Sequence, residues 1–145
     1  HTCKEAAMKK RDIIIALSFL ITGLFAGVYY RELSKMHEAT YQWTMLGMAH
    51  AHFIGIGVLG YLLICLINDK LNPEGIIYKI GMMGYIISAY GVGIMMLIHG
   101  TERTWLDVGP ENPILSGISG VFHIALAVSM VLIFVSWLRS KKTSD

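Results

Sequence analysis

The sequence predicts an all-α integral membrane protein: one four-helix domain, residues 1–145, whose helices run up, down, up and down through a bilayer. Hydrophobic residues make up 54% of the chain and charged residues only 15%, whereas soluble domains carry about a quarter charged residues. A helix needs roughly 20 apolar residues to cross about 30 Å of hydrocarbon. Four stretches meet this requirement: 13–30, 44–67, 76–98 and 113–138.

The connections between these stretches are short and polar. Residues 31–42, 68–74 and 100–112 separate the four apolar runs, and the last connection contains the turn signals Gly109-Pro110 and Asn112-Pro113. Short connections make sequential helices antiparallel neighbours. No linker divides the chain, which indicates a single domain.

Basic residues gather at one set of span ends. They are Lys9, Lys10 and Arg11 before the first span, Lys70 and Lys79 around the second connection, and Arg139, Lys141 and Lys142 after the fourth span. The other two connections hold a balanced set of charges. Because basic residues favour the cytoplasmic side, we expect both termini to be cytoplasmic. The net charge of +2 is small and scattered, so nucleic acid is not an expected partner.

Five of the six histidines fall on or beneath the opposite, outer face. At 1.5 Å of rise per residue, His50 and His52 lie about two turns into the second span and His123 about three turns into the fourth. His99 closes the outer end of the third span, and His37 lies in the first outer connection. Ionisable groups inside a bilayer are costly and usually face a functional partner. We therefore predict a metal or cofactor site with His50, His52, His99 and His123 as candidate ligands.

The spacing of the spans favours haem b, with its iron held by two histidines. In an up-down-up-down bundle spans two and four are diagonal, with axes roughly 11–14 Å apart, about the room that a haem needs between two imidazoles. His50 and His52 lie about 200° apart around one helix, so they cannot both face one target. His50 shares its face with Gly57 and other small or polar residues, which makes it the preferred partner of His123. His52 is then a second ligand, a neighbour, or the true ligand if the helix is rotated the other way.

Other residues are expected around this cofactor. Gly120 clears volume beside His123, as the face of a porphyrin requires. Arg31 and Arg103, near the outer ends of the spans, are candidates for pairing with the haem propionates, because arginine suits charge-assisted bonds to carboxylates. The alternative for both arginines is a side chain that extends to lipid headgroups.

The segment His50-Ala51-His52-Phe53-Ile54-Gly55-Ile56-Gly57 resembles the H-x-[HN]-x-x-x-x-G signature on the second helix of cbb3-type haem-copper oxidase catalytic subunits and of NnrS membrane haem proteins. In the oxidases the first histidine of this signature ligates the low-spin haem, so the resemblance implies that role for His50. A four-span chain lacks the remaining oxidase helices and a second set of histidines. The resemblance therefore does not extend to oxygen reduction.

The chain as a whole resembles a family of small four-span bacterial membrane proteins known only as a domain of unknown function. Three segments carry this resemblance: residues 27–33 (GVYYREL), His50-Ala51-His52, and residues 117–123 (GISGVFH). It implies a multi-pass protein of the bacterial cytoplasmic membrane and brings no activity with it.

These observations predict an electron-transfer protein rather than a stand-alone enzyme, because two imidazoles occupy both axial positions of a haem. The expected cytochrome passes electrons near the outer face, between quinol and a redox partner protein, as a homo-oligomer or as a subunit of a larger respiratory complex. The arrangements that hydrolases and nucleotide-binding enzymes need are not visible in the sequence.

Two other functions stay open. One is the handling of copper or another transition metal, because thioether and imidazole ligands suit copper(I). Five methionines lie in the outer half with the histidines: Met36, Met45, Met48, Met95 and Met96. Methionine is also adaptable packing material. The other function is that of an accessory subunit with no cofactor.

Overall fold

In the computed structural model, helices are the only regular secondary structure of the described residues. The structure describes residues 9–36, 45–106 and 113–140, without the side chains of 103–106. The elements are α1 (Lys10–Met36), α2 (Met45–His52), the π-helix η1 (Phe53–Gly60), α3 (Tyr61–Leu71), α4 (Ile76–Leu106) and α5 (Pro113–Arg139). The helices α2, η1 and α3 follow one another without a break, and we call this rod span two.

Four helical stretches are long and apolar enough to cross a membrane, which confirms the predicted all-α class and the number of spans. They are Lys10–Met36, Met45–Leu71, Ile76–Glu102 and Pro113–Arg139. In a bilayer the backbone polar groups find no water, so a spanning segment has to satisfy them internally as a helix does. Large apolar side chains are accordingly exposed on every span.

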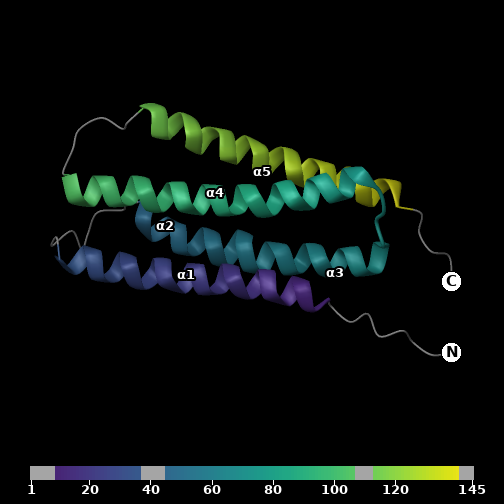
Figure 1. Ribbon diagram of the computed structural model, residues 1–145, viewed down its shortest axis with the longest axis horizontal. Helices are drawn as coiled ribbons and strands as arrows, with labels where there is room; N and C mark the ends of the chain where they lie inside the picture. Colours follow the sequence, from purple (N-terminus) through teal and green to yellow (C-terminus); the bar gives the residue numbers. More distant parts are fainter. Residues whose placement is uncertain (1–8, 37–44, 107–112, 141–145) are drawn as a thin grey trace.

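The four rods lie side by side in the order α1, span two, α4, α5 (Figure 1). The start of α1, the connection from α3 to α4 and the end of α5 lie at the same end of the molecule, which we call the inner end. Half of the spanning window of α4 is buried, against 17% for α5. Both span two and α5 pack against α4, and buried side chains of all four rods form one core, which includes Ile64 of span two, Val92 of α4 and Leu126 of α5.

Glycines on α4 let span two approach closely. A Cβ atom at Gly93 would meet the ring of Phe53, and one at Gly100 would lie 2.5 Å from the backbone nitrogen of Leu46. Small residues at such contacts allow helix backbones to come together in lipid. The close approach of α2 to α4 therefore depends on hydrogen atoms at these two positions.

A second row of glycines on α4 receives α5. A Cβ atom at Gly91 would meet the ring of Phe122, and one at Gly81 would lie 3.0 Å from Cγ1 of Ile133. Because both faces of α4 carry small residues, both neighbouring rods pack against α4, and this accounts for its central place.

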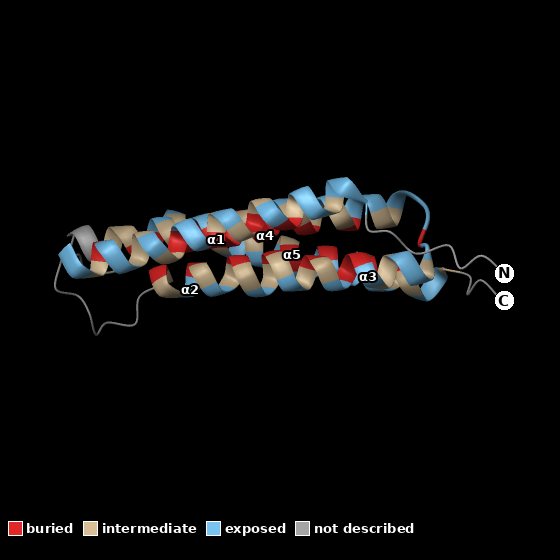
Figure 2. Ribbon diagram, turned by 90° about the horizontal axis from the view of Figure 1, so that it is seen from below, coloured by how far each residue is buried: buried red, intermediate tan, exposed pale blue. Residues whose placement is uncertain are grey.

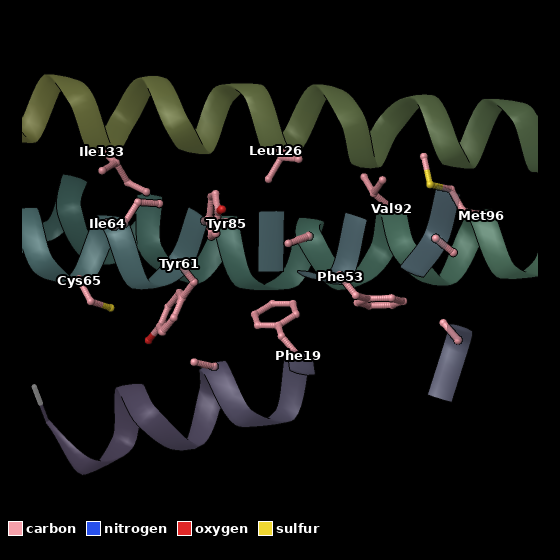
Figure 3. Packing of buried hydrophobic residues seen from close by; sticks show 14 residues of the cluster. Phe19, Phe53, Tyr61, Ile64, Cys65, Tyr85, Val92, Met96, Leu126 and Ile133 are labelled. Carbon is pink, nitrogen blue, oxygen red and sulfur yellow. The ribbon is translucent and has the colours of Figure 1, made fainter. Parts of the chain in front are cut away.

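The buried residues lie where the rods face one another (Figure 2), and many of the core side chains are aromatic (Figure 3). The ring of Phe19 on α1 stacks on that of Tyr90 on α4, with centroids 4.1 Å apart. Phe53 of η1 tilts against Tyr90 with a centroid distance of 6.0 Å. Offset and tilted pairs of this kind are the favourable geometries for aromatic rings, and they join three rods in one core.

The connection from α3 to α4 is a tight turn at the inner end. Asn72 ends α3 with a left-handed backbone (φ 42°), and its N–H donates to the carbonyl of Asn68 at 2.7 Å. Asparagine is among the few residues that adopt this conformation readily. Gly75 follows with φ 104°, so two residues with positive φ turn the chain into α4.

Asn68 also ties three rods together at the inner end. Its amide nitrogen donates to the Tyr78 hydroxyl of α4 at 2.8 Å, and its amide oxygen accepts from Trp137 Nε1 of α5 at 2.6 Å. This side chain therefore links span two to both α4 and α5.

We predict that Asn68→Leu lowers the free energy of unfolding by about 1–3 kcal/mol, because the Trp137 N–H loses its acceptor in a partly buried position. Thermal unfolding of the protein in detergent measures this change. The matched control is Asp69→Asn at the exposed neighbouring position, which should stay within about 0.5 kcal/mol of the parent. Equal stabilities for the two variants would contradict the structural role of Asn68.

Candidate functional site

Three histidines share one hydrogen-bonding pattern: His50, His52 and His123 each hold Nδ1 close to a backbone carbonyl oxygen. The carbonyls belong to Gly23, Met48 and Ser119, at 2.6, 3.2 and 2.8 Å respectively. Because a carbonyl oxygen can only accept, Nδ1 carries the proton in each contact, and in a neutral ring Nε2 then keeps its lone pair. This is the form in which an imidazole ligates a metal through Nε2 while a carbonyl orients the ring.

His50 is turned toward α1. The carbonyl that accepts from it belongs to Gly23 of α1, and a Cβ atom at Gly27 of α1 would lie 2.9 Å from Nδ1 of the ring. Two small residues one turn apart on α1 therefore form the recess that holds this half-buried imidazole.

Gly57 lies on the same face of span two as His50. A Cβ atom there would lie 2.5 Å from the Phe19 ring of α1. The small stripe that the sequence argument assigned to a cofactor is thus occupied by α1, and close packing of two helices explains it.

His52 and His123 do not face α1. His52 is half-buried at the end of α2, and His123 is exposed on α5. The space beside both is open, since a Cβ atom at Gly55 or at Gly120 would meet no atom within 4 Å. Gly120 and His123 thus lie together on an exposed face of α5.

The remaining predicted site residues are placed differently. His99 is buried in α4, with only 6% of its surface exposed. Arg31 is exposed on α1, more than a turn before its end at Met36, with its Nε 3.8 Å from Oε1 of Glu32. The side chain of Arg103 and the whole of His37 lie outside the described residues.

Histidine, cysteine and carboxylate side chains alone form no metal-binding group in the described part of the chain. No group of three or more histidine, cysteine, aspartate or glutamate side chains in that part could hold a metal ion. His50 faces α1, whereas His123 is on α5, which packs on α4. The structure therefore does not bring together the pair that the sequence argument preferred.

A polar cluster at the inner end was not foreseen. The Tyr61 hydroxyl donates to Oδ1 of Asp12 at 3.1 Å, beside a cavity of about 210 Å³ that Asp12, Cys65, Asn68 and Tyr78 help to line. The sequence does hold a signal for this cluster. Asp12 is at the start of span one and Asn68 is near the end of span two. Both lie at the same membrane boundary.

Comparison with known proteins places the chain in a family. The model of a protein family of unknown function, DUF2871, matches residues 8–140, which confirms the resemblance to such a family that the sequence indicated. No curated protein and no solved structure matches the chain. Because the family match covers nearly the whole length, the chain belongs to the DUF2871 family of proteins of unknown function.

Proposed function

We propose that the protein is a membrane-bound b-type cytochrome in which His52 of span two and His123 of α5 ligate one haem. Such a haem, when bound, exchanges single electrons and leaves no coordination position open for a substrate. Two features support the proposal: each imidazole holds Nδ1 near a backbone carbonyl oxygen, which leaves Nε2 of a neutral ring for a metal, and the helix contacts turn both rings to the same side of α4.

The direction of the two imidazoles follows from the helix contacts. Span two meets α4 through Leu46 at Gly100 and Phe53 at Gly93, so residue numbers rise along one helix as they fall along the other. The contacts of α5 with α4 show the same opposition, with Phe122 at Gly91 and Ile133 at Gly81. Span two and α5 therefore run in the same direction on two sides of α4.

His52 precedes the contact residue Phe53, whereas His123 follows the contact residue Phe122. Each histidine is thus rotated about 100° from the line to α4, and the two rotations have opposite sense. Span two and α5 run parallel to each other and contact α4 from two sides. Rotations of opposite sense therefore turn the two imidazoles to the same side of α4. Gly93 and Gly91, the two contact points on α4, differ by about 3 Å of helical rise, so the histidines lie within about one turn of each other.

The open space beside the two histidines supports a flat ligand. Gly55 follows His52 by three residues and Gly120 precedes His123 by three, so each lies close to its histidine on the same helix. Neither position has an atom within 4 Å of where a Cβ atom would be. A porphyrin needs such cleared volume next to its axial ligands.

The proposal assigns the ligand of span two to His52, although the sequence argument preferred His50. His50 is held by Gly23 and Gly27 of α1, on the side of span two away from α5. The last of the three roles considered for His52, that of the true ligand on a helix rotated the other way, fits these contacts better.

The orientation in the membrane is part of the proposal. We infer an up-down-up-down bundle with both termini cytoplasmic, in the inner membrane of a bacterium. Arg11 and Arg139 support this orientation, because they lie at the inner end in α1 and α5 and basic residues favour the cytoplasmic side. The haem then lies in the outer half, where quinol or a redox partner protein exchanges electrons with it.

Absorption spectra of the detergent-purified protein, oxidised and then reduced with dithionite, test this function. We expect a Soret band and an α band that sharpen on reduction, with about one haem per chain, as bis-imidazole haem requires. A colourless, metal-free protein would favour the accessory subunit, and copper without iron in elemental analysis would favour metal handling. Either result would overturn the cytochrome proposal.

A further inference from the structure

His99 is the most buried described histidine and has no hydrogen-bond partner within the described part of the chain. Only 6% of its surface is exposed, whereas each of the other three described imidazoles bonds to a carbonyl. A neutral imidazole carries one donor and one acceptor, and a buried polar group without a partner is costly. A bound ligand would remove this cost.

Two methionines accompany His99 on the buried face of α4. Met95 and Met96 precede it by four and three residues, the two spacings that bring side chains together on one helix face. Both are buried, with 5% and 8% of their surface exposed. In Figure 3 the side chain of Met96 extends from α4 in the direction of α5. One helical turn thus presents two thioethers and one imidazole in surroundings shielded from solvent.

We propose that Met95, Met96 and His99 bind one cuprous ion. Thioether and imidazole ligands favour copper(I), whereas magnesium and calcium prefer oxygen ligands, and structural zinc sites take four thiolate, imidazole or carboxylate ligands. The only acidic residue of α4 is Glu102, three residues beyond His99 toward the outer end, where its charge offsets that of the ion.

This site is independent of the proposed haem. It uses none of the residues assigned to haem ligation, and it lies nearer the outer end, because His99 is six residues beyond Gly93, the contact point of Phe53. A colourless protein that binds copper(I) at these three residues would refute the cytochrome and leave the copper site in place.

Anaerobic titration of the purified full-length chain with cuprous ion, against bicinchoninate as a coloured competitor, tests the inference. We expect about one tightly bound ion per chain. Loss of an outer-shell partner typically lowers metal affinity about 10- to 100-fold, so the Met95→Leu/Met96→Leu double variant and His99→Gln, which remove proposed ligands, should lose at least that much. Leucine nearly conserves the volume of methionine, so the double variant should fold. The matched control is Met83→Leu at an exposed position of the same helix, which should bind copper as the parent does.

X-ray absorption at the copper edge gives a second readout. Sulfur neighbours should be present in the parent and absent in the double variant. Equal affinities for the parent and the double variant, or no sulfur in the parent, would overturn the site. Loss of copper on His52→Ala/His123→Ala but not on Met95→Leu/Met96→Leu would also overturn it, since the ion would then occupy the proposed haem ligands.

Discussion

Alanine in place of His52 or of His123 is expected to abolish stable haem binding, so that the reduced α band disappears and the ratio of haem to protein falls from about one to near zero. The reason is that an iron with two imidazole ligands loses half of its axial coordination when either is removed. The pyridine haemochrome assay, on protein purified at equal yield, measures the ratio.

The informative control is His50→Ala. His50 is held against α1 by the Gly23 carbonyl, so its loss should leave the haem spectrum in place and lower stability by about 1–3 kcal/mol, the cost of an emptied partly buried contact. A variant set in which His50→Ala loses haem and His52→Ala retains it would reverse the assignment and restore the ligand that the sequence argument preferred.

Gly100→Leu is expected to separate α2 from α4. A Cβ atom at this position would lie 2.5 Å from the nitrogen and 2.7 Å from the Cα of Leu46. These are backbone atoms, and no change of rotamer moves them away. The cost should therefore exceed the usual overpacking penalty of about 1–3 kcal/mol, and the melting temperature in detergent should fall sharply.

Gly117→Leu on α5 provides the comparison for this substitution. Nothing lies within 4 Å of a Cβ atom there, and a leucine side chain is favourable on a helix surface that contacts lipid. The same change of residue should therefore leave the melting temperature close to that of the parent. Equal melting temperatures for the Gly100→Leu and Gly117→Leu variants would show that α2 and α4 are not in close contact at Gly100.

The sequence was sufficient to predict the number of spans but not the full length of the helices. Hydropathy ended the first stretch at residue 30 and the third at residue 98, whereas α1 continues to Met36 and α4 to Leu106. The added turns are polar, and helix formation beyond the hydrocarbon leaves no apolar signal. The π-helix η1 was also not predicted, because an apolar run has the same composition whether its hydrogen bonds span four residues or five.

The rise per residue sets the level of each histidine along its helix, but the direction of its side chain could not be predicted. Direction depends on which neighbour receives which face, and the small residues near His50 indicated only that something approaches closely. The structure gives that place to Phe19 and the glycines of α1. The glycines of α4 indicate close contacts with other helices but not which helix each of them meets. The sequence therefore did not reveal that α4 lies between span two and α5.

The exposed face of α5 has a consequence for access to the imidazoles. This helix packs along α4, while His123 and the open surface beside Gly120 face outward. In a bilayer such a surface meets acyl chains and not water. We therefore expect bulky planar molecules to reach His123 sideways from the lipid rather than from the water above.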